Sequence, residues 1–145
     1  MYVSQVLMAS LPNIEIVSLL IIIITRKFGV RSFYSVYIFV ALEILTYGLH
    51  IWVINYLYIW AILCLAVLLI RKTDNTFIYA GVSALFGFLF GTFCSIPYFI
   101  TGGFSFGISY IISGLYFDLL HGIGNAVTAT VLYRPITKVL NKIPL

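Results

Sequence analysis

The chain has 145 residues, of which 63% are hydrophobic and only 8% are charged. A soluble domain carries about 25% charged residues, so this chain has too few charges to cover a water-facing surface. The composition therefore excludes an ordinary soluble domain and predicts an integral membrane protein, with a single transmembrane domain over residues 1–145.

Charges, prolines and glycines divide the chain into apolar runs of helical length. A helix that crosses a hydrocarbon core of ~30 Å needs roughly 20 apolar residues. We expect helices over residues 11 or 14 to 25, 32–49, 52–70, 76–100 and 106–133. Residues 1–10 are also apolar, but a helix of that length covers only ~15 Å and cannot cross by itself.

The beginning of the chain allows two readings. Pro12 interrupts the first apolar stretch, because proline lacks a backbone donor and clashes with the preceding helical turn. In one reading, residues 1–25 form a single kinked span, which gives five helices. In the other, residues 1–11 end a first helix and residues 14–28 form a short second one, which gives six.

The basic residues predict the orientation of the chain. All eight fall in alternate connections or after the last run: Arg26, Lys27, Arg31, Arg71, Lys72, Arg134, Lys138 and Lys142. They therefore lie on one side of the membrane, which the positive-inside rule makes cytoplasmic. We expect a multi-pass protein of the cell membrane with a cytoplasmic C-terminus. The net charge of +4 then reflects topology and does not indicate a nucleic-acid partner.

Small residues recur every four positions in the run 76–100, at Ser83, Gly87, Gly91 and Ser95. Rows of this kind let helix backbones approach closely in a lipid environment. The row predicts either tight packing within this chain or a docking face for another subunit.

A carboxylate, an imidazole and an amide share one helix face in the last apolar run. Asp118, His121 and Asn125 are spaced i, i+3 and i+7. Ionisable side chains inside a span are costly and usually functional. At ~1.5 Å per residue, Asp118 lies ~24 Å and Asn125 ~13 Å from the cytoplasmic Arg134. Asn125 therefore either lies at the bottom of a pocket or packs against the nearby small residues Gly122 and Ala126.

A second polar group lies at a similar depth in other runs. Glu43, Tyr47 and His50 share a face at i, i+4 and i+7, and Asn55 lies near the start of the next run. Glu43 lies ~18 Å and Asn55 ~24 Å from the cytoplasmic charges. Polar groups from several helices thus converge in the middle and outer half of the membrane among many aromatic residues. This arrangement predicts a ligand pocket that opens outward.

The candidate substrate-binding residues are Glu15, Glu43, Tyr47, His50, Trp52, Asn55, Tyr58, Tyr98, Asp118, His121 and Asn125. Among them, Trp52, Tyr58 and Tyr98 are expected to form stacking walls. Carboxylates outnumber basic groups in this set, so we expect a ring-containing ligand that carries hydrogen-bond donors.

Each of these candidates has a structural alternative. Asp118 and His121 can pair with each other and lock the helices together, and Glu43 can pair with a histidine or be protonated. Either tryptophan can belong to the interfacial aromatic belt. His50, at the outer boundary, can be merely solvated.

Catalytic and cofactor patterns are absent from the sequence. It has no H-E-x-x-H, G-x-S-x-G or phosphate-loop pattern. Asp118 and His121 have the spacing of metal ligands, but two ligands without a third make a weak metal site. Cys64 and Cys94 lie apart in apolar runs, where isolated thiols behave as small hydrophobes. We expect no enzyme, no cofactor and no metal, and a chain without a nucleotide site cannot energise transport by itself.

Four stretches of the sequence resemble the substrate-binding S components of energy-coupling factor (ECF) transporters. They are residues 11–20 (LPNIEIVSLL), 55–60 (NYLYIW), 90–98 (FGTFCSIPY) and 114–125 (GLYFDLLHGIGN). The resemblance covers nearly the whole chain. It implies a bundle of six transmembrane helices, here with a short first helix, that binds a vitamin or precursor near the outer face.

The resemblance also implies partners. S components dock on a transmembrane T subunit that is driven by two ATPase subunits, and they release the ligand inward after toppling in the bilayer. A queuosine-type deazaguanine or a thiamine-type precursor fits the expected ligand. The family's first helix often carries an Ala-x-x-x-Ala docking motif, whereas Ser4, Ala9 and Ser10 lack that spacing here. The rival expectation is a structural or assembly subunit whose polar cluster only locks helix packing.

Overall fold

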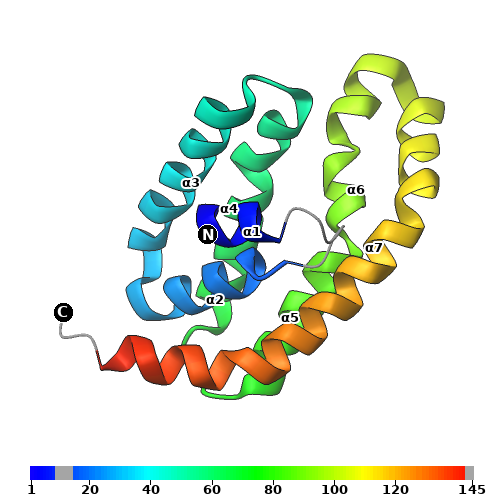
Figure 1. The fold of residues 1–145 in the computed structure, drawn as a ribbon. Coiled ribbons are helices and arrows are strands. Elements are labelled where there is room, and N and C mark those ends of the chain that lie inside the picture. Colours follow the sequence, from blue (N-terminus) through cyan, green and yellow to red (C-terminus); the bar gives the residue numbers. More distant parts are fainter. Residues whose placement is uncertain (9–14, 143–145) are drawn as a thin grey trace.

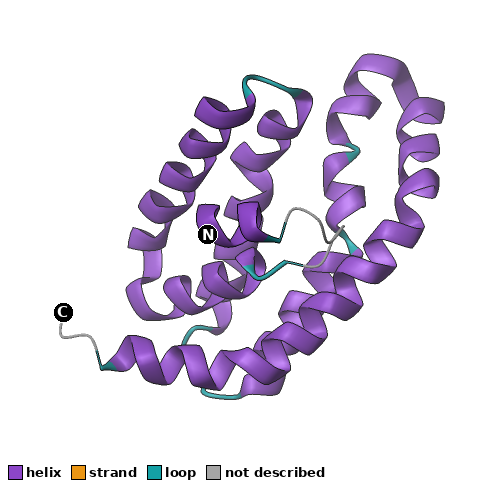
Figure 2. Cartoon of the chain, in the orientation of Figure 1, coloured by secondary structure: helices purple, strands orange, loops and turns teal. Residues whose placement is uncertain are grey.

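The described part of the chain is built from helices. A computed structural model describes residues 1–8 and 15–142, which form helices and short connections and contain no strand (Figure 2). Three helical stretches are long and apolar enough to cross a membrane: Val17–Tyr47, Ile51–Ile70 and Ile96–Asn141. The expected all-helical class is confirmed, and these stretches agree with a membrane protein. The count of six spans stays a prediction.

The helices follow one another with short connections (Figure 1). In chain order they are α1 (Tyr2–Leu7), α2 (Val17–Phe28), the 3-10 turn η1 (Gly29–Arg31), α3 (Ser32–Tyr47), α4 (Ile51–Ile70), α5 (Thr76–Phe88), α6 (Phe90–Cys94) and α7 (Ile96–Asn141).

The first two helices are separate, which agrees with the second reading of the N-terminal stretch. With six residues, α1 covers only ~9 Å and does not cross a membrane by itself. The break at Pro12 and the small residues Ala9 and Ser10 lie outside the described residues. The second helix begins at Val17, three residues after the expected start at residue 14.

Glycines with positive φ make the sharp turns. Gly29 ends α2 with φ 61°, and Gly48 ends α3 with φ 79°. Gly103 has φ 77° within α7 and divides it into two arms, residues 96–102 and 104–141. The chain turns back on itself there, at the top of Figure 1. This turn falls within the connection expected at residues 100–106.

The expected span 76–100 is not one continuous helix. It is interrupted at Leu89, between α5 and α6, and at Ser95, between α6 and α7. Pro97 lies in the first turn of α7, where a backbone N–H would have no acceptor within the helix, so proline is tolerated there. Leu89 has no comparable local signal. The interruption there leaves N–H groups at the start of α6 that need acceptors from outside the helix.

The small-residue row on α5 and α6 packs against the second arm of α7. A Cβ added at Gly87 would lie 2.8 Å from the Cα of Gly122, so the two backbones are close to direct contact. A Cβ added at Gly91 would lie 2.8 Å from Oδ1 of Asp118. The row therefore packs within the chain, as the first of its two readings predicts.

Hydrogen bonds flank this close approach on both sides. The Asn125 side-chain amide donates to the Ser83 carbonyl at 3.1 Å. In the other direction along α7, Asp118 Oδ1 accepts from the Gly91 backbone N–H at 2.8 Å. The carboxylate of Asp118 thus supplies the acceptor that the interrupted helix needs at the start of α6.

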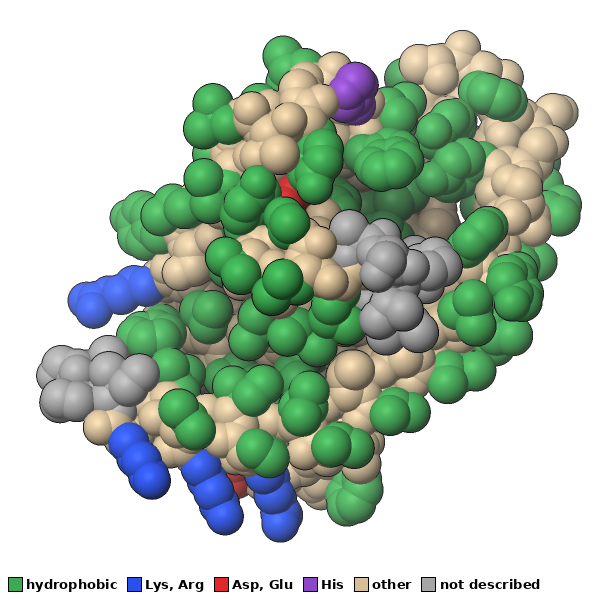
Figure 3. Space-filling view, in the orientation of Figure 1, with side chains coloured by type: hydrophobic (Ala, Val, Ile, Leu, Met, Phe, Trp, Pro, Cys, Tyr) green, Lys and Arg blue, Asp and Glu red, His purple; other side chains and the backbone are tan. Residues whose placement is uncertain are grey.

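Helix α2 lies at the centre of the molecule, packed among the other helices (Figure 1). Its Ile21 and Ile22 are fully buried, as is Ile59 of α4. Large apolar side chains on the outside are strongly exposed, for example Leu45 at 82% and Leu69 at 88%. Figure 3 shows an apolar surface with lysine and arginine side chains gathered toward one end. This distribution suits a surrounding hydrocarbon layer bounded by a polar interface.

Replacing Gly87 by alanine is expected to lower the stability of the fold. The new Cβ meets the backbone of Gly122, which cannot rotate away, so α5 and α7 must separate. Overpacking of this kind costs roughly 1–3 kcal/mol. Thermal unfolding of the detergent-purified protein measures the loss.

Gly81→Ala is the matched control, because Gly81 lies in the same helix with no atom within 4 Å of its added Cβ. Both variants gain the same helix propensity. Equal melting temperatures for the two variants would contradict the close approach of α5 and α7.

Candidate functional site

A carboxylate on α3 is buried beneath the first helix. Glu43 is only 4% exposed, and its Oε2 accepts from Gln5 Nε2 of α1 at 3.2 Å. The same Gln5 nitrogen lies 3.3 Å from the Tyr56 hydroxyl of α4. The second oxygen, Oε1, is buried and has no hydrogen-bond partner among the described residues. Among the described residues, Glu43 therefore offers an acceptor without a partner where α1, α3 and α4 meet.

A series of aromatic rings leads from this carboxylate to α7. The Tyr56 ring contacts Trp60 edge-on at 5.2 Å between centroids, and Trp60 lies 5.8 Å from Phe90 of α6. Phe90 in turn meets the His121 ring edge-on at 4.8 Å. Trp60 is 2% exposed, and its Nε1–H is buried without an acceptor among the described residues. The series thus combines flat apolar walls with one free donor.

His121 pairs with a carboxylate at the opposite end of the series. Its Nε2 lies 3.2 Å from Oε1 of Glu15, and both side chains are mostly buried. Glu15 also accepts from the Ser18 backbone N–H at 2.9 Å, at the first turn of α2. A negative charge is favourable there because the helix dipole is positive at its N-terminus. Among the described residues, Glu15 and not Asp118 is the partner of His121.

Asp118 and Asn125 each combine a packing contact with a free oxygen. Asp118 Oδ1 accepts from Gly91 and the Asn125 amide donates to Ser83, as described above. Asp118 Oδ2 and Asn125 Oδ1 are buried without a partner in the described part of the chain. A buried acceptor left unsatisfied costs about 1–3 kcal/mol, which a ligand that donates a hydrogen bond recovers.

We call these groups the buried polar cluster. Its members are Gln5, Glu15, Glu43, Tyr56, Trp60, Phe90, Asp118 and His121. They come from α1, the segment before α2, and helices α3, α4, α6 and α7. Figure 3 shows the molecule hollowed on one face between the α3–α4 hairpin and the α6–α7 hairpin, which supply most of these residues.

Three other candidates make contacts beside this cluster. The Tyr58 hydroxyl lies 2.8 Å from Asn55 Oδ1 and 2.7 Å from the Phe93 carbonyl, so it joins α4 to α6. Tyr98 stacks on Tyr110 with 4.0 Å between ring centroids, which holds the two arms of α7 together. These aromatic residues therefore have packing partners within the protein.

The remaining candidates lie on the surface near the α3–α4 turn. Tyr47 is 51% exposed and Trp52 is 70% exposed, and His50 is exposed at the start of α4. The structure does not bring these three into the buried polar cluster. Their expected role in binding stays a prediction.

Gln5, Tyr56, Trp60 and Phe90 belong to the buried polar cluster but were not among the candidate binding residues. Gln5 could have been found, because it is a hydrogen-bonding residue inside the apolar N-terminal stretch. Phe90 carries no polar signal, and its place depends on the interruption of the helix at Leu89.

The cluster is suited to hydrogen bonding and ring stacking. Carboxylate oxygens from two helices and one indole N–H provide acceptors and a donor, and the aromatic rings provide apolar walls. No group of three histidine, cysteine or acidic side chains within residues 1–8 and 15–142 is placed to hold a metal ion.

No protein-family model, curated protein or solved structure matches the chain. The resemblance to S components therefore rests on the sequence motifs alone.

Asp118→Ala is expected to destabilise the protein more than Asp118→Asn. Alanine removes the acceptor for the Gly91 N–H and leaves that donor buried, at a cost of roughly 1–3 kcal/mol. Asparagine keeps an oxygen at the same place. Thermal unfolding of the two variants beside wild type measures the difference, and equal losses would show that the contact with Gly91 does not support the interrupted helix.

Proposed function

We propose that the chain is the substrate-binding membrane subunit of an ECF-type importer, an S component. It binds a small ring-containing micronutrient, such as a vitamin, a vitamin precursor or a queuosine-type deazaguanine. It passes this ligand inward together with a transmembrane T subunit and a pair of ATPase subunits.

The observation that carries this proposal is the set of unpaired polar atoms beside aromatic rings. Glu43 Oε1 and Trp60 Nε1 are both buried without a partner among the described residues. Tyr56 lies between them, since it contacts both Gln5 of the Glu43 pair and the Trp60 ring. A planar ligand with both donors and acceptors satisfies these atoms and stacks on the rings.

Charge distribution supports an outward-facing site. Glu15 lies just before α2 and accepts from the Ser18 N–H in its first turn, whereas Arg26 and Lys27 lie in its last turn. Arg31 likewise precedes α3, and Glu43 lies ~18 Å further along that helix. The buried polar cluster is thus displaced from the cationic end. With that end in the cytoplasm, the cluster faces the outer side of the membrane.

The described helices are compatible with six membrane segments. α1, α2, α3 and α4 account for four of them, although α1 alone is too short to span. The fifth consists of α5, α6 and the first arm of α7, and the sixth is the second arm of α7. Because the sequence has no phosphate-loop pattern, active transport needs separate ATPase subunits.

A structural or assembly subunit is the second candidate function. Asp118 and Asn125 favour it, because each already uses one polar atom to hold α7 against α5 and α6. This function predicts that the polar residues affect stability alone, with no small molecule involved.

Tryptophan fluorescence tests the binding function, because the chain has only Trp52 and Trp60. Trp52→Phe leaves the buried Trp60 as the reporter, and Trp60→Phe leaves the exposed Trp52. Titration with a panel of vitamins and nucleobases is expected to change the emission of Trp52→Phe. Trp60→Phe should show a weak response because the ligand loses the indole donor. No change in the tryptophan emission of the wild-type protein with any compound of the panel would contradict the binding function.

Glu43→Gln is expected to abolish most of the thermal stabilisation that a ligand from this panel produces. The substitution keeps the shape of the side chain. When the oxygen of the new amide accepts from Gln5 Nε2, its NH2 group takes the place of Oε1 and faces the hydrogen-bond donors of the ligand. Asp74→Asn is the matched control, since Asp74 is an exposed carboxylate at the opposite end of the molecule. A structural role instead predicts a lower melting temperature for Glu43→Gln with no ligand dependence in either variant.

A further inference from the structure

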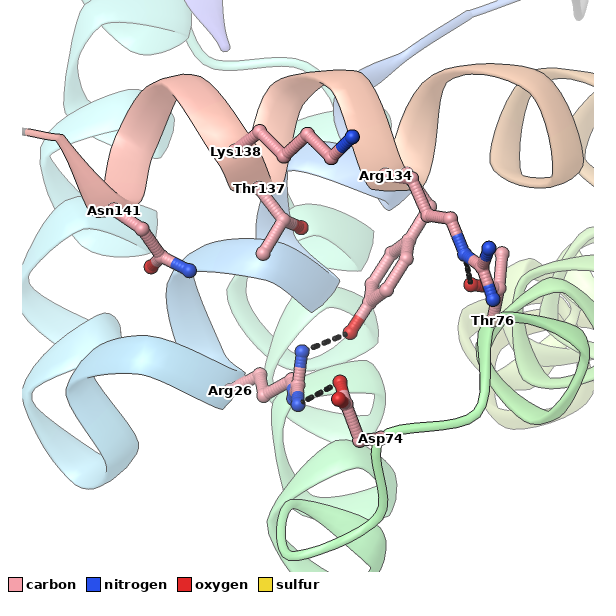
Figure 4. A pocket seen from close by; sticks show the side chains of 8 residues that line it. Arg26, Asp74, Thr76, Arg134, Thr137, Lys138 and Asn141 are labelled. Atoms are coloured by element: carbon pink, nitrogen blue, oxygen red, sulfur yellow. Dashed lines mark hydrogen bonds and ion pairs between the residues drawn. The ribbon is translucent and has the colours of Figure 1, made fainter.

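A cationic cleft lies at the opposite end of the molecule from the buried polar cluster. One hollow of about 400 Å³ lies between the end of α2, the α4–α5 connection and the end of α7 (Figure 4). A second hollow of about 280 Å³ adjoins it, because Arg26, Thr137 and Asn141 line both. We call the two together the cationic cleft.

Positive charge dominates the cleft. Its charged lining residues are Arg26, Lys27, Arg71, Arg134, Lys138 and Asp74. Five cations thus face one carboxylate, which gives the cleft a net charge of +4. The whole chain has the same net charge, so its excess positive charge is concentrated here. Such a concentration favours an anionic occupant.

Internal contacts fix part of the lining in place. Arg26 forms an ion pair with Asp74, as Figure 4 shows, and it also donates to the Tyr133 hydroxyl at 2.8 Å. Lys27 Nζ donates to the Leu140 carbonyl near the end of α7. These contacts hold α2 against α7 and pair Asp74, the only carboxylate among the described residues that line the cleft. The lining of the cleft is therefore held in place before an anion binds, and its carboxylate, Asp74, is already paired with Arg26.

Other donors remain available. Arg134 uses its Nε to donate to the Thr76 hydroxyl at 3.1 Å, which leaves the two terminal nitrogens of its guanidinium for another partner. Lys138 makes no hydrogen bond or ion pair with the described residues. The Thr137 hydroxyl is buried and also lacks a partner in that part of the chain. Guanidinium, ammonium and hydroxyl donors on one wall match the oxygens of a phosphate group.

The neighbouring surface is apolar. Val131 and Val139 of α7 are 61% and 65% exposed, and Phe77 at the start of α5 is 73% exposed. A free phosphate gains nothing from such side chains, whereas the acyl chains of a phospholipid pack against them. Basic hollows between helices at the end of a membrane domain are suited to lipid head groups.

We propose that the cationic cleft binds the phosphate of an anionic phospholipid head group, with Arg134, Lys138 and Thr137 as its donors. The bound lipid ties the end of α7 to α2 and to the α4–α5 connection. This site is separate from the micronutrient site and does not depend on the transport role, because it requires only that the chain lies in a bilayer.

The test compares lipids and free phosphate on the full-length protein in detergent after removal of bound lipid. Phosphatidylglycerol, phosphatidylcholine and inorganic phosphate are added separately, and thermal unfolding and native mass spectrometry measure binding. Phosphatidylglycerol is expected to raise the melting temperature in a saturable manner and to remain bound in the mass spectrum. Phosphatidylcholine and inorganic phosphate at equal concentration are expected to do neither.

Arg134→Gln combined with Lys138→Gln removes two donors of the cleft and is expected to weaken phosphatidylglycerol binding roughly 30-fold. Lys72→Gln combined with Lys142→Gln removes the same charge from exposed positions outside the lining and keeps most of the affinity. Lys138→Gln alone serves if the first double variant fails to fold, since it breaks no contact with the described residues.

Equal weakening by the two double variants would overturn the proposal, because it would show diffuse attraction to the charged end. Equal stabilisation by phosphatidylcholine would overturn it as well. Saturable binding of inorganic phosphate without binding of phosphatidylglycerol would also overturn it, because it would show that the cleft binds a free anion and not a lipid.

Discussion

The structure depends on the close approach of α5 and α6 to the second arm of α7. Gly87 and Gly122 bring the backbones close to contact, and Asp118 and Asn125 hydrogen-bond across the approach on either side. Without the Asp118 carboxylate, the interruption at Leu89 would leave the Gly91 N–H buried without this acceptor. That interruption in turn places Phe90 between Trp60 and His121. The close packing of α5 and α6 against α7 thus positions Phe90 as one aromatic wall of the candidate binding site.

Much of the helix pattern follows from the sequence, because charges and glycines divide the apolar runs. The expected helices at 32–49 and 52–70 correspond closely to α3 and α4, and the turn at Gly103 falls where glycines predict it. The interruption at Leu89 could not be predicted. The acceptor that satisfies the Gly91 N–H there is the carboxylate of Asp118, which is distant in the sequence, and no proline or charged residue marks the position locally.

The polar members of the site were easier to predict than its aromatic walls. Glu43, Asp118, His121 and Asn125 are buried, as ionisable and amide residues within apolar runs suggest. The sequence favoured Trp52 as a wall, whereas Trp60 is the buried ring. Helix α4 is apolar on all sides, so periodicity does not distinguish the face toward other helices from the face toward lipid. Distance along the helix fixes depth in the membrane but not direction around its axis.

The central claim is that the polar atoms of the buried polar cluster that lack a partner among the described residues bind a small molecule. The most direct measurement is mass spectrometry of the compounds released on denaturation, from protein that was expressed in cells supplied with the ligand panel and purified without further ligand. The binding account predicts an equimolar ring-containing compound from the wild-type protein and little of it from Glu43→Gln. Release of no such compound from wild type after expression in cells supplied with the ligand panel, or equal release from both proteins, would contradict it.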